Sequence, residues 1–280
     1  MPADSRSKTT IIKLRKHKRT GEKTCLVTAY DYPQALIADK AGVDAILVGD
    51  SRGAQDAFLI GDMPYMSYQP SNQIAIENAG RFIVSGMDCV KVEGAMIDRV
   101  EAISNSGIMV MSHLGLTPHT RAKLGGYKVQ GKTAKSAEIV LDQALRLQDA
   151  GCSFLLLEAM PTEPAGMIAE KLDIPVYGIG GGDRVDGQLV IMHDLVGLFW
   201  EFKSKFVKRY CEAGQMMQSA LEEYKSEVKG GQFPAQENFY EIKEEELEKL
   251  LGDSSWKYEK DRVEDLPSNH SVTPRTTKRD

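Results

Sequence analysis

The chain has 280 residues, of which 42% are hydrophobic and 27% charged, and its formal net charge is −5. This composition excludes a wholly disordered chain and a generally basic nucleic-acid-binding protein. No apolar run approaches the roughly 18–20 residues that cross a bilayer, and the N-terminal residues lack the apolar core of a secretory signal. The four cysteines, Cys25, Cys89, Cys152 and Cys211, lie far apart, which disfavours a disulfide framework. We therefore expect a globular protein of the cytoplasm with no membrane or nucleic-acid partner.

Short apolar segments alternate with longer amphipathic ones along the chain. The short segments are rich in Val, Ile and Leu, which is typical of strands covered on both faces. Amphipathic helical segments lie between most of them. Eight strands alternating with helices favour a (β/α)8 TIM barrel, and an open doubly wound sheet is the alternative. The expected strands are residues 24–30, 44–49, 57–61, 89–92, 108–112, 153–157, 175–180 and 188–193.

Both ends of the chain differ from this central pattern. Residues 1–23 are basic with a few apolar positions, so we expect an N-terminal helix that is either packed or solvated. Residues 24–239 are assigned to the barrel, with a long helix over about 204–229 packing after the last strand. Residues 240–280 are charged and polar, and beyond one short helical segment we expect a mobile tail or a partner-docking segment.

Polar side chains stand at the carboxyl ends of five successive apolar segments. A single Asp after a strand is usually a turn former or a helix cap, and a single His is usually structural. Five successive strands with the same arrangement are harder to explain in that way, and this end of a barrel carries its active site. The candidate site residues are Asp50, Ser51, Asp62, Lys91, Glu93, His113 and Glu158.

The kinds of side chain in this set indicate a metal-dependent reaction. Asp50, Asp62 and Glu93 would repel one another in one pocket unless a cation neutralised them, and carboxylate oxygens suit Mg²⁺. Lys91 and Glu93 are two positions apart, so on a strand both point to the same face. Glu158 ends a very apolar segment, where burial would raise its pKa towards that of a general base for a C–H bond. The residues alone predict a metal-dependent enzyme that enolises a small oxo acid.

Nine ordered motifs extend from about Thr10 to Phe239. The most distinctive are SHLGLTPH and LGGYKVQGKT, and the others are TAYDYPQALIADKAGVDAILVGDS, DMPYMSY, VKVEG, LLLEAMP, YGIGGG, DGQLVIMHDLVGL and FVKRY. Together they resemble the ketopantoate hydroxymethyltransferase family. The resemblance implies a barrel of the phosphoenolpyruvate/pyruvate type that transfers a hydroxymethyl group from 5,10-methylenetetrahydrofolate to 3-methyl-2-oxobutanoate. The product would be 2-dehydropantoate, on the route to pantothenate, and the enzyme would be a cytoplasmic homo-oligomer, often a decamer in this family.

The same resemblance implies a role for each candidate residue and for two glycine-rich segments. Residues 124–132 and 178–182 would form loops at the rim of the active site, although plain flexible loops are equally compatible with their composition. The implied roles are Mg²⁺ ligands for Asp50, Asp62 and Glu93, contacts with the oxo acid for Asp50, Ser51, Asp62, Lys91 and His113, and proton acceptor for Glu158.

The segment between the second and third expected strands is unusually short. Only SRGAQD separates the strand that ends near Asp50 from the one that begins near Ala57. A parallel crossover needs about a dozen residues or more, and the family resemblance implies roughly two dozen further residues with a helix here. A bare extended return, an antiparallel strand and a strand displaced from the barrel are the possible geometries. Three functions stay open: an active hydroxymethyltransferase, a related oxo-acid lyase or mutase, and an inactive deletion form that retains the barrel.

Overall fold

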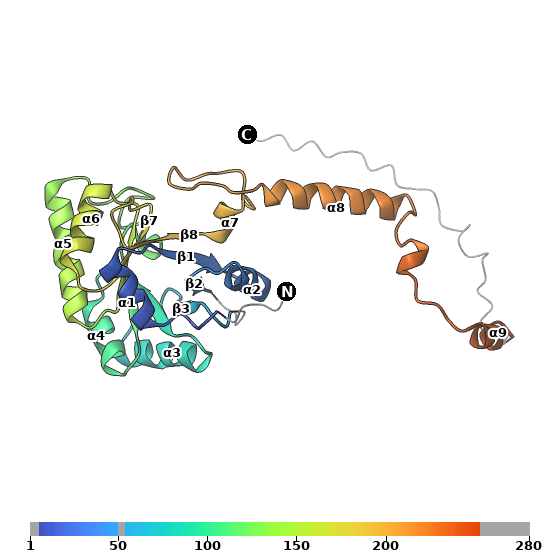
Figure 1. Ribbon diagram of the computed structural model, residues 1–280, viewed down its shortest axis with the longest axis horizontal. Helices are drawn as coiled ribbons and strands as arrows, with labels where there is room; N and C mark the ends of the chain where they lie inside the picture. Colours follow the sequence, from blue (N-terminus) through green and yellow to red (C-terminus); the bar gives the residue numbers. More distant parts are fainter. Residues whose placement is uncertain (1–5, 50–53, 253–280) are drawn as a thin grey trace, which may run out of the picture. The chain divides into compact units, whose positions relative to one another are not determined.

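The computed structural model of the chain describes residues 6–49 and 54–252. Within them, eight parallel strands pair in chain order and β1 also pairs with β8, so the sheet closes into a barrel (Figure 1). The predicted (β/α)8 barrel is confirmed, and the open sheet is excluded. The strands are β1 (Thr24–Ala29), β2 (Ala45–Val48), β3 (Phe58–Asp62), β4 (Cys89–Glu93), β5 (Val110–Gly115), β6 (Phe154–Glu158), β7 (Val176–Ile179) and β8 (Gly187–Val190).

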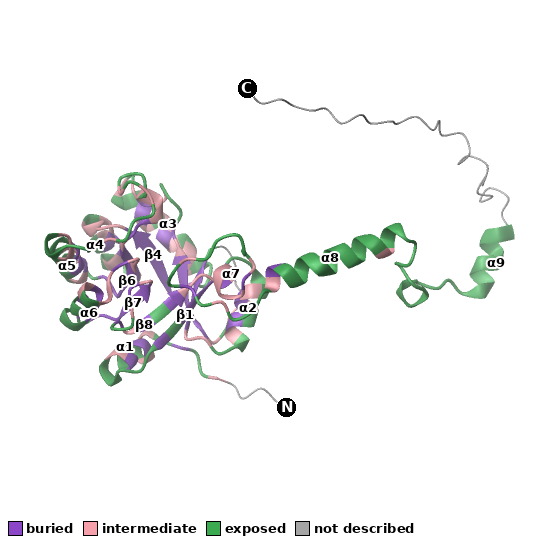
Figure 2. Ribbon diagram, turned by 90° about the horizontal axis from the view of Figure 1, so that it is seen from above, coloured by how far each residue is buried: buried purple, intermediate pink, exposed green. Residues whose placement is uncertain are grey.

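Helices cover the outside of the barrel and bury its strands (Figure 2). Local sequence explains where several of them begin, because Asp31, Ser71 and Thr133 accept backbone N–H groups of the first turns of α2, α3 and α5. Gly42, Gly86 and Gly151, which follow α2, α3 and α5, all have a positive φ angle, as is common where a helix ends. The helices up to β8 and just after it are α1 (Ile11–Thr20), α2 (Tyr32–Lys40), α3 (Asn72–Val84), α4 (Ile97–Asn105), the 3₁₀ helix η1 (Pro118–Thr120), α5 (Ala134–Asp149), α6 (Thr162–Lys171) and α7 (Met192–Leu195).

The alternation of side chains along each strand produces two packed layers. Inward residues such as Phe58, Phe154 and Tyr177 form a buried cluster inside the barrel. Outward residues such as Val92 and Leu155 pack against the helices. A residue that continues the inward row at the carboxyl end of a strand therefore points into the mouth of the barrel.

The N-terminal helix α1 covers the opposite end of the barrel. Leu14 belongs to the inner cluster and is fully buried. Lys13 and Lys18 bind Asp44 and Asp186, which precede β2 and β8, at 3.1 and 2.9 Å. Of the two predicted states for the N-terminal segment, the packed helix is correct. Because α1 covers the amino ends of the strands, the carboxyl ends form the open mouth of the barrel.

The link between β2 and β3 contains no helix among its described residues, 49 and 54–57. The two strands are nevertheless parallel and in direct register, from Ala45 opposite Phe58 to Val48 opposite Gly61. Of the three geometries considered, the direct return is therefore correct, and the antiparallel and displaced strands are excluded. Asp50, Ser51 and the two residues after them lie outside the described residues.

A side chain of α2 holds the described part of this link. The Asp39 carboxylate accepts the backbone N–H groups of Gln55, Asp56 and Ala57 at 2.8, 3.2 and 2.8 Å. Lys8 donates to the carbonyl oxygen of Ala57 at 2.8 Å. These contacts satisfy backbone groups just before β3 and fix the point where that strand enters the barrel.

The predicted helix over 204–229 is wrong in its first part. Helix α8 spans only Ala213–Lys229, because the backbone at and before its start bonds to the end of α7: Tyr210 donates to Leu195, and Ala213 to Val196, both at 2.9 Å. Gly214, near the start of α8, is buried. Tertiary hydrogen bonds override helix propensity here.

The chain divides into two compact units, Met1–Ser219 and Ala220–Asp280, which are described separately. The second unit contains most of α8, the 3₁₀ helix η2 (Gln236–Asn238) and α9 (Glu244–Gly252), the short charged helix expected from the sequence. The rest of the expected tail lies outside the described residues. In the described part of the chain, no helix has both the length and the apolar character needed to cross a membrane.

Candidate active site

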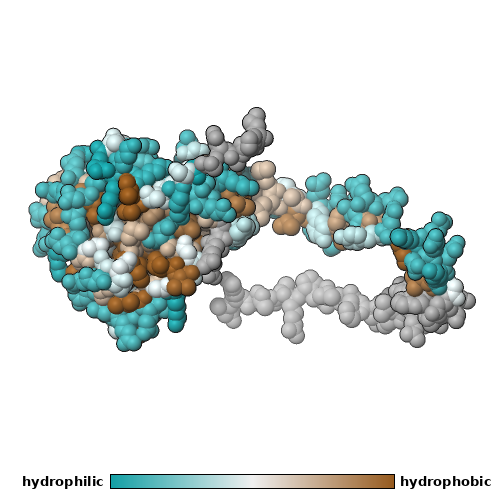
Figure 3. All heavy atoms as spheres, turned by 60° about the horizontal axis from the view of Figure 1, so that its bottom comes forward, coloured by the Kyte–Doolittle hydropathy of each residue, from teal (hydrophilic) through white to brown (hydrophobic). Residues whose placement is uncertain are grey.

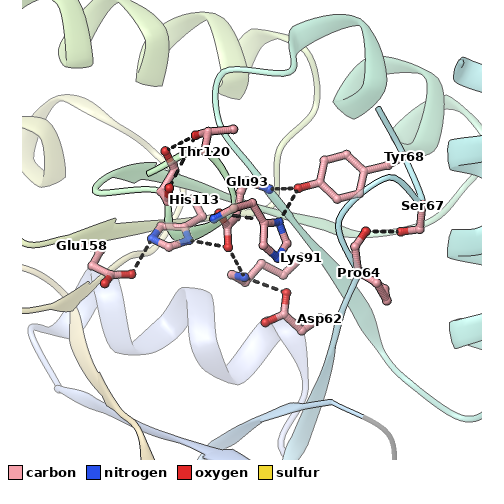
Figure 4. Close-up of polar contacts among 11 residues, drawn as sticks. Asp62, Pro64, Ser67, Tyr68, Lys91, Glu93, His113, Thr120 and Glu158 are labelled. Carbon is pink, nitrogen blue, oxygen red and sulfur yellow. Dashed lines mark hydrogen bonds and ion pairs between the residues drawn. The ribbon is translucent and has the colours of Figure 1, made fainter. Parts of the chain in front are cut away.

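Five of the candidate residues meet at the mouth of the barrel. Their side chains come from four adjacent strands, β3 to β6, and continue the inward row of each strand (Figure 4). Register explains the meeting: Asp62 lies opposite Lys91, and Glu93 lies opposite His113. Glu158 occupies the last position of β6. Parallel pairing thus brings residues that are distant in sequence to one edge.

Asp62 and Glu93 converge on one ammonium group. Lys91 Nζ lies 2.7 Å from Asp62 Oδ1 and 3.5 Å from Glu93 Oε1. The Lys91 and Glu93 side chains are buried, and Asp62 is one-third exposed at the mouth. Burial opposes ionisation of Glu93, but His113, Lys91 and a backbone N–H outweigh it and lower its pKa to about 2. Glu93 is therefore a carboxylate at neutral pH.

His113 lies between two carboxylates. Its Nε2 is 3.1 Å from Glu158 Oε2, and its Nδ1 is 3.8 Å from Glu93 Oε1. Burial disfavours the charged ring, but Glu158 and Glu93 outweigh that effect and raise the pKa of His113. When the ring is protonated, these contacts are ion pairs, and neither ring nitrogen has a partner in hydrogen-bond geometry. Buried polar atoms without such partners are rare, so both nitrogens of the ring are available to a bound ligand.

Two residues that the sequence interpretation missed support Glu93. The Tyr68 hydroxyl accepts the Glu93 N–H at 3.0 Å and lies 3.3 Å from His119 Nδ1. The His119 N–H donates to Glu93 Oε2 at 3.0 Å. Tyr68 is fully buried, and burial raises its pKa to about 12, so the hydroxyl is neutral. Both residues belong to the quoted motifs DMPYMSY and SHLGLTPH, but neither ends a strand, which is why strand-end reasoning did not find them.

The backbone around Glu158 requires special conformations. Gly115, at the end of β5, has φ +85°, and a Cβ there would come within 2.3 Å of the Glu158 carbonyl oxygen. The next residue, Leu116, donates its N–H to that oxygen at 2.9 Å. Ala159, directly after Glu158, has a left-handed φ of 48°, which is unfavourable for a residue with a Cβ. Close packing of two strand ends thus fixes the direction of the Glu158 side chain.

The predicted Mg²⁺ site is only partly described. Asp50 and Ser51 lie outside the described residues, and within residues 6–49 and 54–252 no three His, Cys, Asp or Glu residues are grouped to hold a metal ion. The remaining two predicted ligands, Asp62 and Glu93, face the same point, because each lies within 3.5 Å of the same Lys91 nitrogen. Two carboxylates directed at a shared cation fit a hard divalent ion.

Comparison with known proteins extends these observations to a family. Residues 8–54 and 51–236 match the family model described as ketopantoate hydroxymethyltransferase. A 3-methyl-2-oxobutanoate hydroxymethyltransferase of Alkaliphilus metalliredigens is 42% identical over 276 residues, covering 87% of this chain and 98% of that protein. An enzyme of the same name from Syntrophobacter fumaroxidans is 41% identical over 256 residues, covering 81% of this chain and 91% of that protein.

The lengths of the alignments and the ranges of the family match are consistent with a short link between β2 and β3. The first alignment has 276 positions, but 87% of this 280-residue chain is about 244 residues, which leaves about 30 positions without a counterpart here. The family match consists of two ranges, which meet and overlap at residues 51–54, within that link.

A solved structure shares the fold. Phosphonopyruvate hydrolase, in a complex with oxalate and Mg²⁺, superposes with a TM-score of 0.51 and 10% identity, covering 88% of this chain and 95% of that chain. At this identity the likeness shows a common barrel and no common reaction.

Proposed function

The chain belongs to the ketopantoate hydroxymethyltransferase family, and on that basis we propose that it transfers a hydroxymethyl group from 5,10-methylenetetrahydrofolate to 3-methyl-2-oxobutanoate. The products are 2-dehydropantoate and tetrahydrofolate, and one water supplies the hydroxyl oxygen. The observation that supports this reaction best is the row Asp62, Lys91, Glu93, His113 and Glu158 at one end of the barrel. It combines a cation-binding pair of carboxylates with a separate carboxylate that can act as a base.

We assign Asp62 and Glu93, together with Asp50, to a Mg²⁺ ion. When bound, this ion supplies positive charge that lowers the cost of forming an enolate from a 2-oxo acid. The low pKa of Glu93, about 2, keeps it in the ionised form that a ligand needs. Lys91 adds a second positive charge, and with Ser51 it holds the substrate carboxylate.

Glu158 is the proposed proton acceptor. Its carboxylate removes the proton from C3 of the oxo acid, and the enolate carbon then forms a bond to the one-carbon unit of the folate. His113, whose pKa is raised by Glu158 and Glu93, keeps Glu158 in place and contributes positive charge beside the developing enolate. Tyr68 and His119 position Glu93 and do not contact the reacting atoms.

The same proposal includes a homo-oligomer in the cytoplasm. Apolar side chains are exposed on the outer helices, among them Ile37 on α2 and Ile74 and Val84 on α3. Figure 3 shows hydrophobic patches between hydrophilic residues on one face of the barrel unit. Exposed apolar surface of this kind favours burial against another subunit. Light scattering of the purified chain gives the number of subunits.

Product formation tests the proposed function. The full chain is incubated with Mg²⁺, 3-methyl-2-oxobutanoate and 5,10-methylenetetrahydrofolate, and 2-dehydropantoate is measured by mass spectrometry. We expect product that requires both substrates and disappears with EDTA. Cleavage or rearrangement of the oxo acid without folate would favour the lyase or mutase alternative. Binding of neither substrate would favour the inactive deletion form.

A further inference from the structure

The segment between β3 and α3, residues 63–71, lies between two of the proposed Mg²⁺ ligands (Figure 4). It begins directly after Asp62, the last residue of β3. It carries Tyr68, whose hydroxyl accepts the Glu93 N–H at 3.0 Å. The position of this segment therefore bears on both carboxylates.

The first half of the segment is exposed and forms a turn. Met66 is 56% exposed and has a left-handed φ of 70°. The Ser67 N–H and hydroxyl both donate to the Pro64 carbonyl oxygen, at 3.0 and 2.7 Å, and Asn78 on α3 donates to the Ser67 carbonyl oxygen at 2.7 Å. The backbone that follows enters the protein interior, where its carbonyl groups need donors.

One side chain of α4 supplies those donors. Arg99 Nε donates to the Tyr68 carbonyl oxygen at 3.0 Å, and Arg99 Nη2 donates to the Gln69 carbonyl oxygen at 3.2 Å. Arg99 Nη1 donates to Oδ1 of Asn72, the first residue of α3. All three guanidinium nitrogens thus bind residues 68–72, and the rigid planar fork of the group makes this contact directional. Because α4 follows β4, Arg99 joins the segment after β4 to the segment after β3.

The Tyr68 side chain extends this restraint to Glu93. Tyr68 is fully buried, and a close-packed side chain cannot shift independently of its backbone. Its hydroxyl holds the Glu93 N–H and also lies 3.3 Å from His119 Nδ1, while the His119 N–H donates to Glu93 Oε2. A displacement of the Tyr68 backbone would therefore disturb both contacts that hold Glu93.

We propose that Arg99 is a positioning residue for the Mg²⁺ site, which holds Tyr68, and through it Glu93, in the orientation that converges with Asp62. Arg99 acts through Tyr68 and binds neither the ion nor the oxo acid. The inference rests on the proposed function for the identity of the ion. Partners that orient metal ligands from outside change the affinity for the metal when they are removed.

Amide hydrogen exchange in EDTA tests the positioning role without metal or substrate. Arg99→Met keeps an apolar stem and removes all three donors, so we expect the Glu93 N–H to exchange about three- to tenfold faster. The Leu155 N–H, which donates to the Pro175 carbonyl oxygen at 3.0 Å, reports the general stability of the barrel and should accelerate less. Arg99→Lys keeps the charge and one donor nitrogen and should lie between Arg99→Met and the parent chain. NMR measures the rates at both amides.

Arg146→Met is the matched control. Arg146 lines the same hollow as Arg99, at the start of α4, but its side chain is 61% exposed and forms an ion pair with Asp142 on its own helix. Its replacement should leave the exchange of Glu93 unchanged. No acceleration at Glu93 in Arg99→Met, or equal acceleration at Glu93 and Leu155, would overturn the assignment.

Titration with Mg²⁺ alone measures the consequence for the ion. We expect Arg99→Met to bind Mg²⁺ about three- to tenfold more weakly than the parent chain, because Arg99 lies one contact further from the ion than a direct partner of a ligand. Arg99→Lys should be intermediate and Arg146→Met unchanged by calorimetry. Faster exchange at Glu93 with unchanged Mg²⁺ affinity would contradict the role at the ion site. Absence of Mg²⁺ binding in the parent chain would contradict the proposed function, and exchange at Glu93 would still show whether Arg99 positions that residue.

Discussion

Asp62 Oδ1 lies 2.7 Å from Lys91 Nζ, and the two residues are direct neighbours in the register of β3 and β4. The relationship depends on β3 running parallel to β4 despite the short link that precedes β3. An antiparallel β3 would place Asp62 at the far end of the barrel. The short link therefore preserves the contact between Asp62 and Lys91, although its described residues contain no crossover helix.

Replacement of Lys91 tests whether Asp62 and Glu93 bind a cation. Lys91→Met removes the charge that separates the two carboxylates, so their repulsion should lower the melting temperature in EDTA. Added Mg²⁺ should then raise the melting temperature more in the variant than in the parent chain, because binding to the native state stabilises it. Differential scanning fluorimetry with and without Mg²⁺ measures both effects.

Lys8→Met is the control for Lys91→Met. Lys8 also forms an ion pair with a carboxylate, that of Asp88 at 2.8 Å, but it is more exposed and Asp88 precedes β4, away from the site. Lys8→Met should alter neither the size of the rise in melting temperature on adding Mg²⁺ nor the dependence of this rise on the Mg²⁺ concentration. An equal Mg²⁺ shift in Lys91→Met and in the parent chain would argue against a cation between Asp62 and Glu93.

Tyr68→Phe tests the positioning of Glu93. The change leaves the buried Glu93 N–H without its acceptor, which should lower the free energy of unfolding by about 1–3 kcal/mol. Because the pKa of Tyr68 is about 12, the difference between the variant and the parent chain should be constant from pH 6 to 9. Chemical denaturation measures the free energy, and Tyr65→Phe, at a 54% exposed ring, is the control. A stability equal to that of the parent chain would show that the Tyr68 hydroxyl does not hold Glu93.

Asp39→Asn tests the anchor of the link between β2 and β3. Asn retains only one acceptor oxygen for three backbone N–H groups and loses the charge, so we expect the free energy of unfolding to fall by about 1 kcal/mol. Asp149→Asn, at an exposed residue on α5, should have little effect. Urea denaturation compares the two variants, and equal stabilities would contradict the anchoring role.

The same anchor should make stability depend on pH in the acid range. Slight burial raises the pKa of Asp39, but the N–H groups of the link and Arg6 outweigh it, so its pKa in the folded chain is lowered. A carboxyl group with a lowered folded pKa stabilises the fold fully above its unfolded value, near about 4, and this stabilisation is lost as the pH falls through the folded value. The parent chain and Asp39→Asn should therefore converge in stability below about pH 4. A constant difference across that range would contradict the account.

The sequence predicted the barrel and most of its strands because alternating apolar segments are a local signal. It also placed Lys91 and Glu93 on one face, since two-residue spacing determines that on any strand. It did not reveal Asp39, Tyr68 or His119, whose contacts join segments between 16 and 51 residues apart. It wrongly extended α8 to 204, because the hydrogen bonds that stop the helix come from the end of α7.

Exchange of the C3 proton of 3-methyl-2-oxobutanoate in D₂O, followed by NMR with Mg²⁺ and without folate, tests the central claim most directly. That claim is that the polar row at the ends of β3 to β6 enolises an oxo acid. The parent chain should exchange the proton, and Glu158→Gln should reduce the rate about 100- to 10,000-fold while the oxo acid still raises its melting temperature. Equal exchange rates in the two proteins, or no exchange by the parent chain, would contradict the account.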